Sequence, residues 1–223
     1  MEIASVCAIL DPASSPLDRA LAAQRRPPDH LVRDGGPLRG RLERALASGA
    51  DWVWVLDGSV VPREGSLLEL LHGLDRVGEL QEPHVMTGVV LAPDGLVDEG
   101  RVLWYRRNQI DIAMASAEAR LLPIRAATGS VLVRRDAIEA ELPPERAHLA
   151  PAAVLEWTAR ILRTRTGYLA PESESEAVEP GYDPASDPVT AARLLFGGAL
   201  QRFDRLRYGF ELAERVGGRS AEG

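Results

Sequence analysis

Short apolar segments alternate with segments of helical spacing throughout the first half of the chain. Apolar runs bounded by turn residues predict buried strands, and apolar positions recurring at helical spacing predict amphipathic helices. A strand–helix alternation predicts a parallel sheet with right-handed crossovers and helices on both faces. We therefore expect an α/β fold, with its first strands at 3–10, 30–33, 52–56 and 84–91.

Helix start and stop signals lie between these expected strands. Ser15 is followed by a proline, a pair that suits an N-cap and the first helical position. A second helix is expected over 38–48, because Gly49 favours a helix C-terminus there. The sequence SLLE at 66–69 has the spacing of a capping box, so a third helix is expected to start at Ser66.

The second half of the chain breaks this regular alternation. The elements expected there are strands at 122–126, at 130–133 and from Gly167, and helices at 135–141 and 151–165. The stretch that follows is acidic and rich in proline, as linkers often are, and the last segment is amphipathic. We expect a domain over 1–175, a linker over 176–188 and a C-terminal amphipathic helical tail over 189–223.

Composition excludes several classes of function. The net charge is −7, so no global field attracts nucleic acid or anionic lipid. All 26 basic residues are arginine, so an anion site has to use guanidinium or backbone N–H groups. One cysteine, no basic N-terminal region and no apolar run of about 20 residues predict a cytoplasmic protein without membrane association.

Two aspartates follow expected parallel strands at their C-terminal ends. Asp34 opens the sequence DGG and Asp57 opens the sequence DGS. Ligands of open α/β sheets bind at this edge, so we interpret the two as candidates for a ligand site on adjacent strand ends. Asp-Gly is also a common turn dipeptide, so a role as turn formers stays open for both.

A phosphatase-like interpretation of VLDGSV fails on one residue. The haloacid dehalogenase type of loop, D-x-D-G-T, needs a nucleophilic carboxylate two positions before Asp57 to form its covalent intermediate. Val55 occupies that position. The chain therefore lacks the nucleophile of that enzyme class.

Four stretches of the chain follow the order of the motifs in one enzyme family. They are PLDRALAAQRRPPDHLVRDGG, RALASGADWVWVLDGSVVPREGSLLELL, LPIRAATGSVLVRRDAI and LEWTARILRTRTGYLAPES. By these stretches, residues 3–175 resemble bacterial family 2 glycosyltransferases, and most closely the actinobacterial galactofuranosyl/rhamnosyl type. The resemblance implies a GT-A-like three-layer sandwich with a mostly parallel central sheet. It also implies inverting transfer of a sugar from a nucleotide sugar to a glycan or lipid-linked acceptor.

The resemblance assigns roles to individual residues. Asp34, Asp57 and Ser59 match positions that bind the nucleotide, and Asp57 also matches a metal position. Glu156 lies on the helix that matches the catalytic segment. Acceptor-binding positions are matched by Gly129, Trp157 and Arg160. Trp104 and Arg107 lie where acceptor loops usually are and are further acceptor-binding candidates, in an aromatic–arginine cluster that either binds a sugar diphosphate or packs at the surface.

The chain departs from the family pattern where the acids are needed. Gly58 and Ser59 stand in place of the second and third acids of D-D-D, and Ala153 and Val154 stand where the paired acids of the helix align. Hard divalent ions prefer carboxylate oxygens, so any dependence on Mn²⁺ or Mg²⁺ is expected to be weak. Glu156 is the acid left on that turn.

Two functions remain open on these grounds. The first is a glycosyltransferase that is slow or metal-independent. The alternative is a catalytically inactive relative that binds nucleotide or a partner protein. A homodimer through the tail is a further expectation. In either case, alanine at Asp34 or at Asp57 is expected to weaken nucleotide binding while leaving the melting temperature nearly unchanged.

Overall fold

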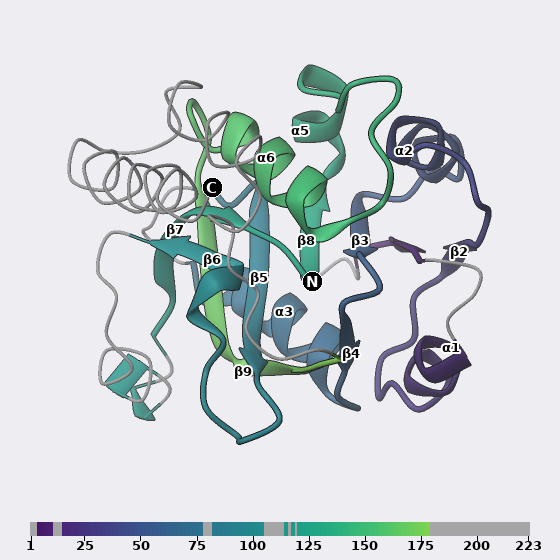
Figure 1. The fold of residues 1–223 in the computed structure, drawn as a ribbon. Helices are drawn as coiled ribbons and strands as arrows, with labels where there is room; N and C mark the ends of the chain where they lie inside the picture. The colour runs from purple at the N-terminus through teal and green to yellow at the C-terminus, as the bar shows by residue number, and fades with distance from the viewer. Residues whose placement is uncertain are drawn as a thin grey trace, which may run out of the picture.

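The computed structural model describes residues 4–10, 15–77, 82–104, 114–115, 117–118 and 120–178 (Figure 1). Arg107, the tail 189–223 and the linker from residue 179 onward lie outside the described residues. The strands are β1 Val6–Ile9, β2 His30–Val32, β3 Trp52–Leu56, β4 Val60–Pro62, β5 Val85–Leu91, β6 Val102–Trp104, β7 Leu122–Ala127, β8 Ser130–Arg134 and β9 Gly167–Ala177. The helices are α1 Ser15–Ala22, α2 Leu38–Ala47, α3 Ser66–Asp75, the 3₁₀-helix η1 Glu99–Arg101, α5 Arg135–Ala140 and α6 Pro151–Ile161.

The described strands form one mixed sheet in the order β2-β1-β3-β8-β5-β9-β7-β6, with β4 also paired to β9. Strands β1, β2, β3, β5, β6 and β9 run in one direction, and β4, β7 and β8 run in the other. The expected α/β class is therefore confirmed, but the uninterrupted parallel order is wrong. Strand β8 lies antiparallel between β3 and β5, where a purely parallel sheet would place those two side by side.

Strand β9 is much longer than the short last strand expected from Gly167. It runs for 11 residues to Ala177, so the acidic sequence SESEA belongs to the sheet. Ser173 and Ser175 are buried while Glu174 is half-buried and Glu176 exposed. The alternation of a half-buried strand is present, with serine on the inner face in place of an apolar residue.

The capping box expected at 66–69 does not form. Gly65 is the N-cap of α3 and offers no side chain, while the Oε1 of Gln24 accepts the N–H of Leu67 in the first turn. The hydroxyl of Ser66 instead donates toward the carbonyl oxygens of Arg63 and Glu174. Ser66 thereby joins the start of α3 to β9, and the tertiary contact replaces the local one.

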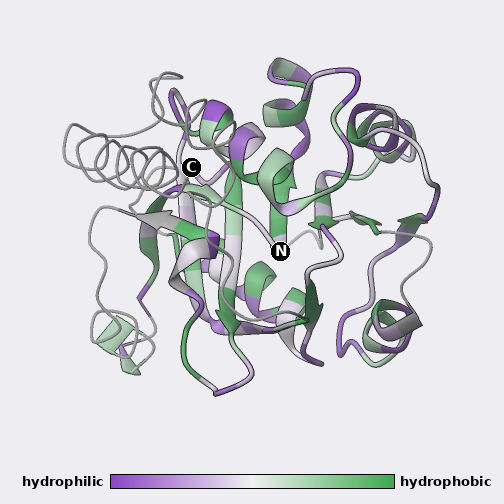
Figure 2. Cartoon of the chain, viewed as in Figure 1, coloured by the Kyte–Doolittle hydropathy of each residue, from purple (hydrophilic) through white to green (hydrophobic). Residues whose placement is uncertain are grey.

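Two hydrophobic clusters cover the two faces of the sheet. Helices α2, α5 and α6 pack with alternate strand residues such as Val53 and Val55 on one face. Helices α1 and α3 pack on the other face, where Trp52 and Trp54 lie. Figure 1 shows these helix layers above and below the sheet, and Figure 2 shows hydrophobic residues concentrated in the central strands. The described residues thus form a three-layer sandwich.

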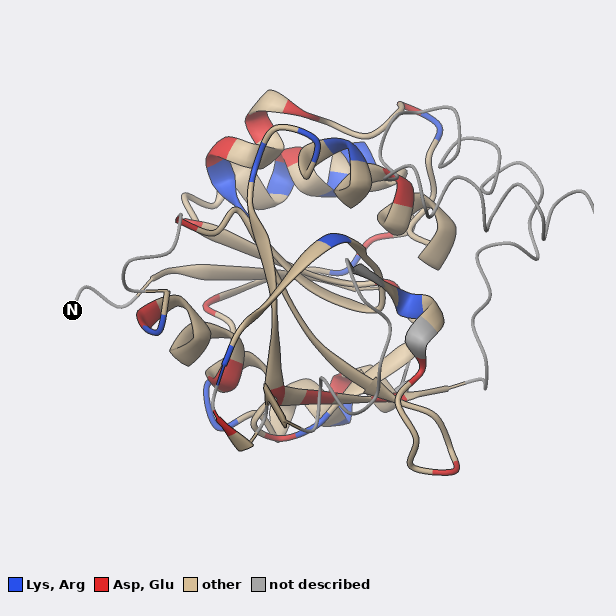
Figure 3. Ribbon diagram, turned by 90° about the vertical axis from the view of Figure 1, so that its left-hand side faces the viewer, with Lys and Arg blue, Asp and Glu red and all other residues tan. Residues whose placement is uncertain are grey.

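Charged side chains lie mainly outside the central strands. Figure 3 shows arginine and acidic residues over the helices and loops, while the strands between them are largely uncharged. Within the described part of the chain, no helix combines the length and the apolar character needed to cross a membrane.

Candidate functional site

The C-terminal ends of β1, β2 and β3 lie at one edge of the sheet because these strands are parallel. Asp34 follows β2 and Asp57 follows β3, as expected. The two strand ends are not adjacent, since β1 lies between them. Two strand spacings separate them by about 10 Å. A nucleoside with its phosphates can bridge such a span, whereas a single ion cannot.

Asp34 is a half-exposed carboxylate held by arginines of α2. Its Oδ1 lies 2.6 Å from Nη2 of Arg44 and 3.7 Å from Nε of Arg41. Arg41 is buried and also donates to the carbonyl oxygens of Leu10 and Gly36. Arg41 therefore fixes the end of β1 and the loop after β2 to one helix, and it leaves Asp34 facing outward.

Asp57 is a buried carboxylate that shapes its own turn. Its Oδ1 accepts the backbone N–H of Ser59 at 3.0 Å and also the Ser59 hydroxyl. This is an Asx turn, the alternative role considered for the Asp-Gly pair. Gly58, at its centre, has a φ of 81°, a conformation that residues with a side chain rarely adopt. The turn explains why a glycine stands where the family pattern has an acid.

The second oxygen of Asp57 binds the turn between β7 and β8. Oδ2 accepts the backbone N–H of Gly129 at 2.7 Å and the hydroxyl of Thr128. The Thr128 hydroxyl also lies 2.9 Å from the carbonyl oxygen of Pro151, the first residue of α6. Asp57 therefore links the end of β3 to the β7–β8 turn and, through Thr128, to the start of α6. Gly129, expected to bind the acceptor, contributes a buried N–H to this network and has a φ of 90°.

A buried arginine that sequence reasoning missed completes the network. Nη1 of Arg101 lies 2.5 Å from the Ser59 hydroxyl, and its Nε lies 2.9 Å from Oδ2 of Asp98. The side chains of Arg101 and Asp98 are 2% and 4% exposed. The i, i+3 spacing of Asp98 and Arg101 was visible in the sequence, but such spacing is common on surfaces and carried no sign of burial.

The oxygen atoms at Asp57 and Ser59 do not fit the ligand set of a divalent metal ion. A hard cation needs carboxylate oxygens with free lone pairs. Both oxygens of Asp57 accept hydrogen bonds from the protein, and the Ser59 oxygen already receives a guanidinium N–H. In the described part of the chain, no group of three or more His, Cys, Asp or Glu side chains could hold a metal.

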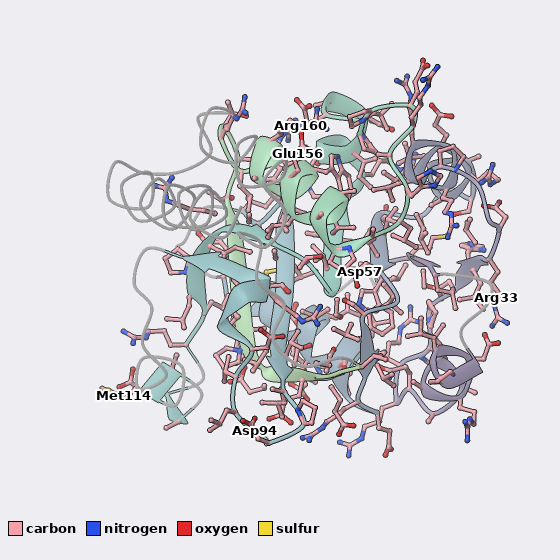
Figure 4. All side chains as sticks on the ribbon, in the orientation of Figure 1. Arg33, Asp57, Asp94, Met114, Glu156 and Arg160 are labelled. Carbon is pink, nitrogen blue, oxygen red and sulfur yellow. The ribbon has the colours of Figure 1, made fainter. Side chains whose placement is uncertain are left out.

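Helix α6 holds the residues matched to the catalytic segment. Glu156 and Arg160 are half-buried, and Figure 4 places both on the outer side of α6, away from Asp57. Nη1 of Arg160 forms an ion pair with Glu141 at 2.9 Å. Trp157 is fully buried in the core, where its indole N–H donates to the carbonyl oxygen of Glu141. Arg160 and Trp157 thus attach α6 to the end of α5, and Trp157 lies away from any surface that an acceptor could reach.

The structure brings together Asp57, Ser59 and Gly129 but not the other candidates. Asp34 lies two strands away, and Glu156 lies on the outside of α6. The backbone of Trp104 ends β6.

Solved structures resemble this fold at low sequence identity. A197 from STIV matches with a TM-score of 0.51 and 13% identity, over 77% of this chain and 84% of that chain. The glycosyltransferase TarS from S. aureus matches with a TM-score of 0.51 and 10% identity, over 95% of this chain and 43% of that chain. A structure of TarS residues 1–349 in complex with UDP-GlcNAc has a TM-score of 0.48 and 12% identity, over 95% and 71% of the two chains.

The two matches with a TM-score of 0.51 show a GT-A-like fold. The chain spans less than half the length of the longer TarS chain. No protein-family model and no curated protein sequence matches the chain.

Proposed function

We propose that this chain binds a nucleotide-diphosphate sugar across the ends of β1, β2 and β3 and transfers the sugar to a glycan or lipid-linked acceptor. One observation carries the proposal: in a GT-A-like fold, the edge of the sheet used by ligands carries an outward-facing aspartate and a rigid acidic loop. A donor of the galactofuranosyl or rhamnosyl class, as the sequence resemblance implies, is part of this proposal.

In this proposal Asp34 binds the nucleoside part of the donor, and the loop at 57–59 faces its sugar diphosphate. The Asp34 carboxylate is 45% exposed and can accept hydrogen bonds from ribose hydroxyls or the base. Arg44, itself 50% exposed, supplies a guanidinium beside it. The 57–59 loop lies two strands away, so the sugar diphosphate is expected to extend toward Ser59.

Inverting transfer makes two demands on the remaining residues. The acceptor oxygen attacks the anomeric carbon while the bond to the diphosphate breaks, and the acceptor proton passes to a carboxylate base. The departing diphosphate keeps the bonding electron pair and needs positive charge nearby. Glu156 is the candidate base on α6, and the buried guanidinium of Arg101 is the cation beside the 57–59 loop.

Nucleotide binding tests the proposal directly. Calorimetry with a panel of nucleoside diphosphates is expected to detect binding to the wild type at or below millimolar concentration. Asp34→Ala should weaken the preferred nucleotide about tenfold, the effect of losing roughly 1.4 kcal/mol of hydrogen bonding. Asp94→Ala is the control, because Asp94 is an exposed loop residue that Figure 4 places far from Asp57. A wild type that binds none of the panel would overturn the proposed function.

A nucleotide-binding relative without catalysis is the second candidate, and the first turn of α6 favours it. That described turn, which begins beside Thr128, has no acidic residue, and Glu156 faces outward. A GT-A-like chain without a catalytic acid could bind nucleotide and regulate or scaffold another transferase.

Glu156→Gln separates the two candidates. In a transferase that uses Glu156 as its base, the substitution should slow sugar transfer at least 10²-fold and leave nucleotide affinity unchanged. Transfer is measured by release of nucleoside diphosphate in the presence of acceptor, with Glu139→Gln on the exposed side of α5 as the control. Undiminished transfer by Glu156→Gln would remove Glu156 from the mechanism. A wild type that binds nucleotide without turning over any donor would establish the second candidate.

A further inference from the structure

The position of a cation beside the 57–59 loop is filled by a side chain of the protein itself. Arg101 is 2% exposed, and its guanidinium lies between the carboxylate of Asp98 and the hydroxyl of Ser59. Ser59 connects Arg101 to Asp57, because its hydroxyl accepts from Arg101 and donates to the Asp57 carboxylate. The positive group therefore contacts oxygen atoms from two segments, the start of η1 and the loop after β3.

The Asp98 side chain and backbone hydrogen bonds on either side of η1 hold Arg101 in place. The 3₁₀-helix η1 puts Arg101 three residues after Asp98, so that the two side chains pair within one turn. The carbonyl oxygen of Arg101 accepts the backbone N–H of Thr128 at 2.9 Å, and the N–H of Asp98 donates to Val90 at 2.8 Å. Backbone hydrogen bonds to β5 and to the β7–β8 turn thus fix the arginine relative to Gly129 in that turn.

We propose that Arg101 is a built-in cation that takes the place of a divalent metal ion beside the 57–59 loop, so that nucleotide binding needs no metal. The statement about nucleotide binding rests on the proposed function. The statement that Arg101 occupies a cation position does not depend on any ligand. Arg101 acts through Ser59 and is a positioning residue, since its buried side chain holds the loop that faces the ligand.

The oxygen atoms around the guanidinium are of the kind that also bind hard cations. Removing the guanidinium would leave the Asp98 carboxylate and the Ser59 hydroxyl oxygen without the cation whose N–H groups they now accept. Mg²⁺ and Mn²⁺ prefer such carboxylate and hydroxyl oxygens. A cation site built for guanidinium should therefore accept a divalent ion once the guanidinium is gone.

The first experiment needs no nucleotide. Melting temperatures of the wild type, Arg101→Ala and Arg41→Ala are measured in EDTA and across a titration of Mn²⁺. Arg101→Ala should melt lower than the wild type in EDTA, and Mn²⁺ should raise its melting temperature in a saturable manner. The rise should reach about 5 to 10 °C at a hundredfold excess over the dissociation constant. If the variant does not fold in EDTA, the yield of refolding with and without Mn²⁺ gives the same readout.

Arg41→Ala is the matched control, because it also removes a buried arginine, and among the described residues only the Asp34 carboxylate lies within 4 Å of that guanidinium, at 3.7 Å. Its melting temperature and that of the wild type should not respond to Mn²⁺. Arg101→Lys, which keeps the positive charge, should also be insensitive. The proposal fails if Mn²⁺ leaves Arg101→Ala unchanged or stabilises all four proteins equally, because the effect would then be absent or nonspecific.

The second experiment measures nucleotide affinity of the wild type in EDTA and in Mn²⁺. We expect the two dissociation constants to agree within about threefold. A loss of tenfold or more in EDTA would overturn the built-in cation while leaving the proposed function intact. A wild type that binds no nucleotide in either condition would remove the proposed function and the nucleotide half of this proposal. The response of Arg101→Ala to Mn²⁺ would still decide whether Arg101 fills a cation position.

Discussion

The Asp57→Ala variant should be markedly less stable than the wild type, by about 3 to 5 kcal/mol in the free energy of unfolding. Asp57 is 5% exposed, and its carboxylate accepts hydrogen bonds from Ser59, Thr128 and Gly129. Alanine leaves these buried donors without their acceptor, and each such loss costs about 1 to 3 kcal/mol. Urea unfolding followed by circular dichroism measures the change.

Asp34→Ala is the comparison for this result. Asp34 is half-exposed and its short ion pair is with the half-exposed Arg44, and exposed pairs of this kind contribute about 0 to 1 kcal/mol. The sequence alone predicts unchanged melting temperatures for both variants. The structure retains that expectation for Asp34 and reverses it for Asp57. Equal stabilities of the two variants would show that the network around Asp57 contributes little to folding.

Gly88→Ala is expected to be the most disruptive glycine substitution in the sheet. A Cβ on Gly88 would lie 2.2 Å from the carbonyl oxygen and 2.8 Å from the carbonyl carbon of Ser173. The pairing of β5 with β9 shifts register at this point. Ser173 cannot move aside easily, because its hydroxyl donates to the carbonyl oxygen of Ser66 at 2.9 Å.

The clash involves backbone on both strands, so the cost should reach or exceed about 3 kcal/mol, the upper end for overpacking. Gly35→Ala is the control, since a Cβ there would meet nothing within 4 Å. The control should stay within about 0.5 kcal/mol of the wild type or gain slightly from a less flexible unfolded chain. Both are measured by the same urea unfolding. A stable Gly88→Ala variant would mean that β9 can shift at the register change.

The elements of the fold could be predicted from the sequence better than their arrangement. The apolar run at 52–56 predicted β3 with its observed bounds, and the strands β7 and β8 were found within a residue of their ends. Apolar periodicity says which residues are buried, but it does not say which strand is the neighbour. The antiparallel insertion of β8 depends on tertiary packing, so the alternating pattern of the first half suggested a simpler sheet.

Polar strands were the hardest elements to predict. The start of the expected linker belongs to β9, because the sequence SESEA buries serine hydroxyls at positions where a typical strand buries valine. Composition suggested disorder there, while the period-two alternation favoured a strand.

In the candidate site, too, individual residues could be predicted from the sequence but their contacts could not. Asp57 and Ser59 were identified from their place after a strand, and the structure adds what they bind. Arg101 could not be found in this way, since its role depends on Ser59 more than 40 positions earlier. A buried cation is defined by contacts between distant segments, which a single sequence does not reveal.

The place of β8 in the sheet also constrains how the chain is made. Strands β3 and β5 leave the ribosome well before Ser130, yet each needs β8 as its neighbour. At about 5 to 20 residues per second, synthesis from Leu91 to Ser130 takes about 2 to 8 seconds. During that interval β3 and β5 lack β8, so the backbone N–H and C=O groups along those edges have no ladder partner. The sheet therefore closes only after β8 has been made, and until then the open edges of β3 and β5 can pair with other exposed strands.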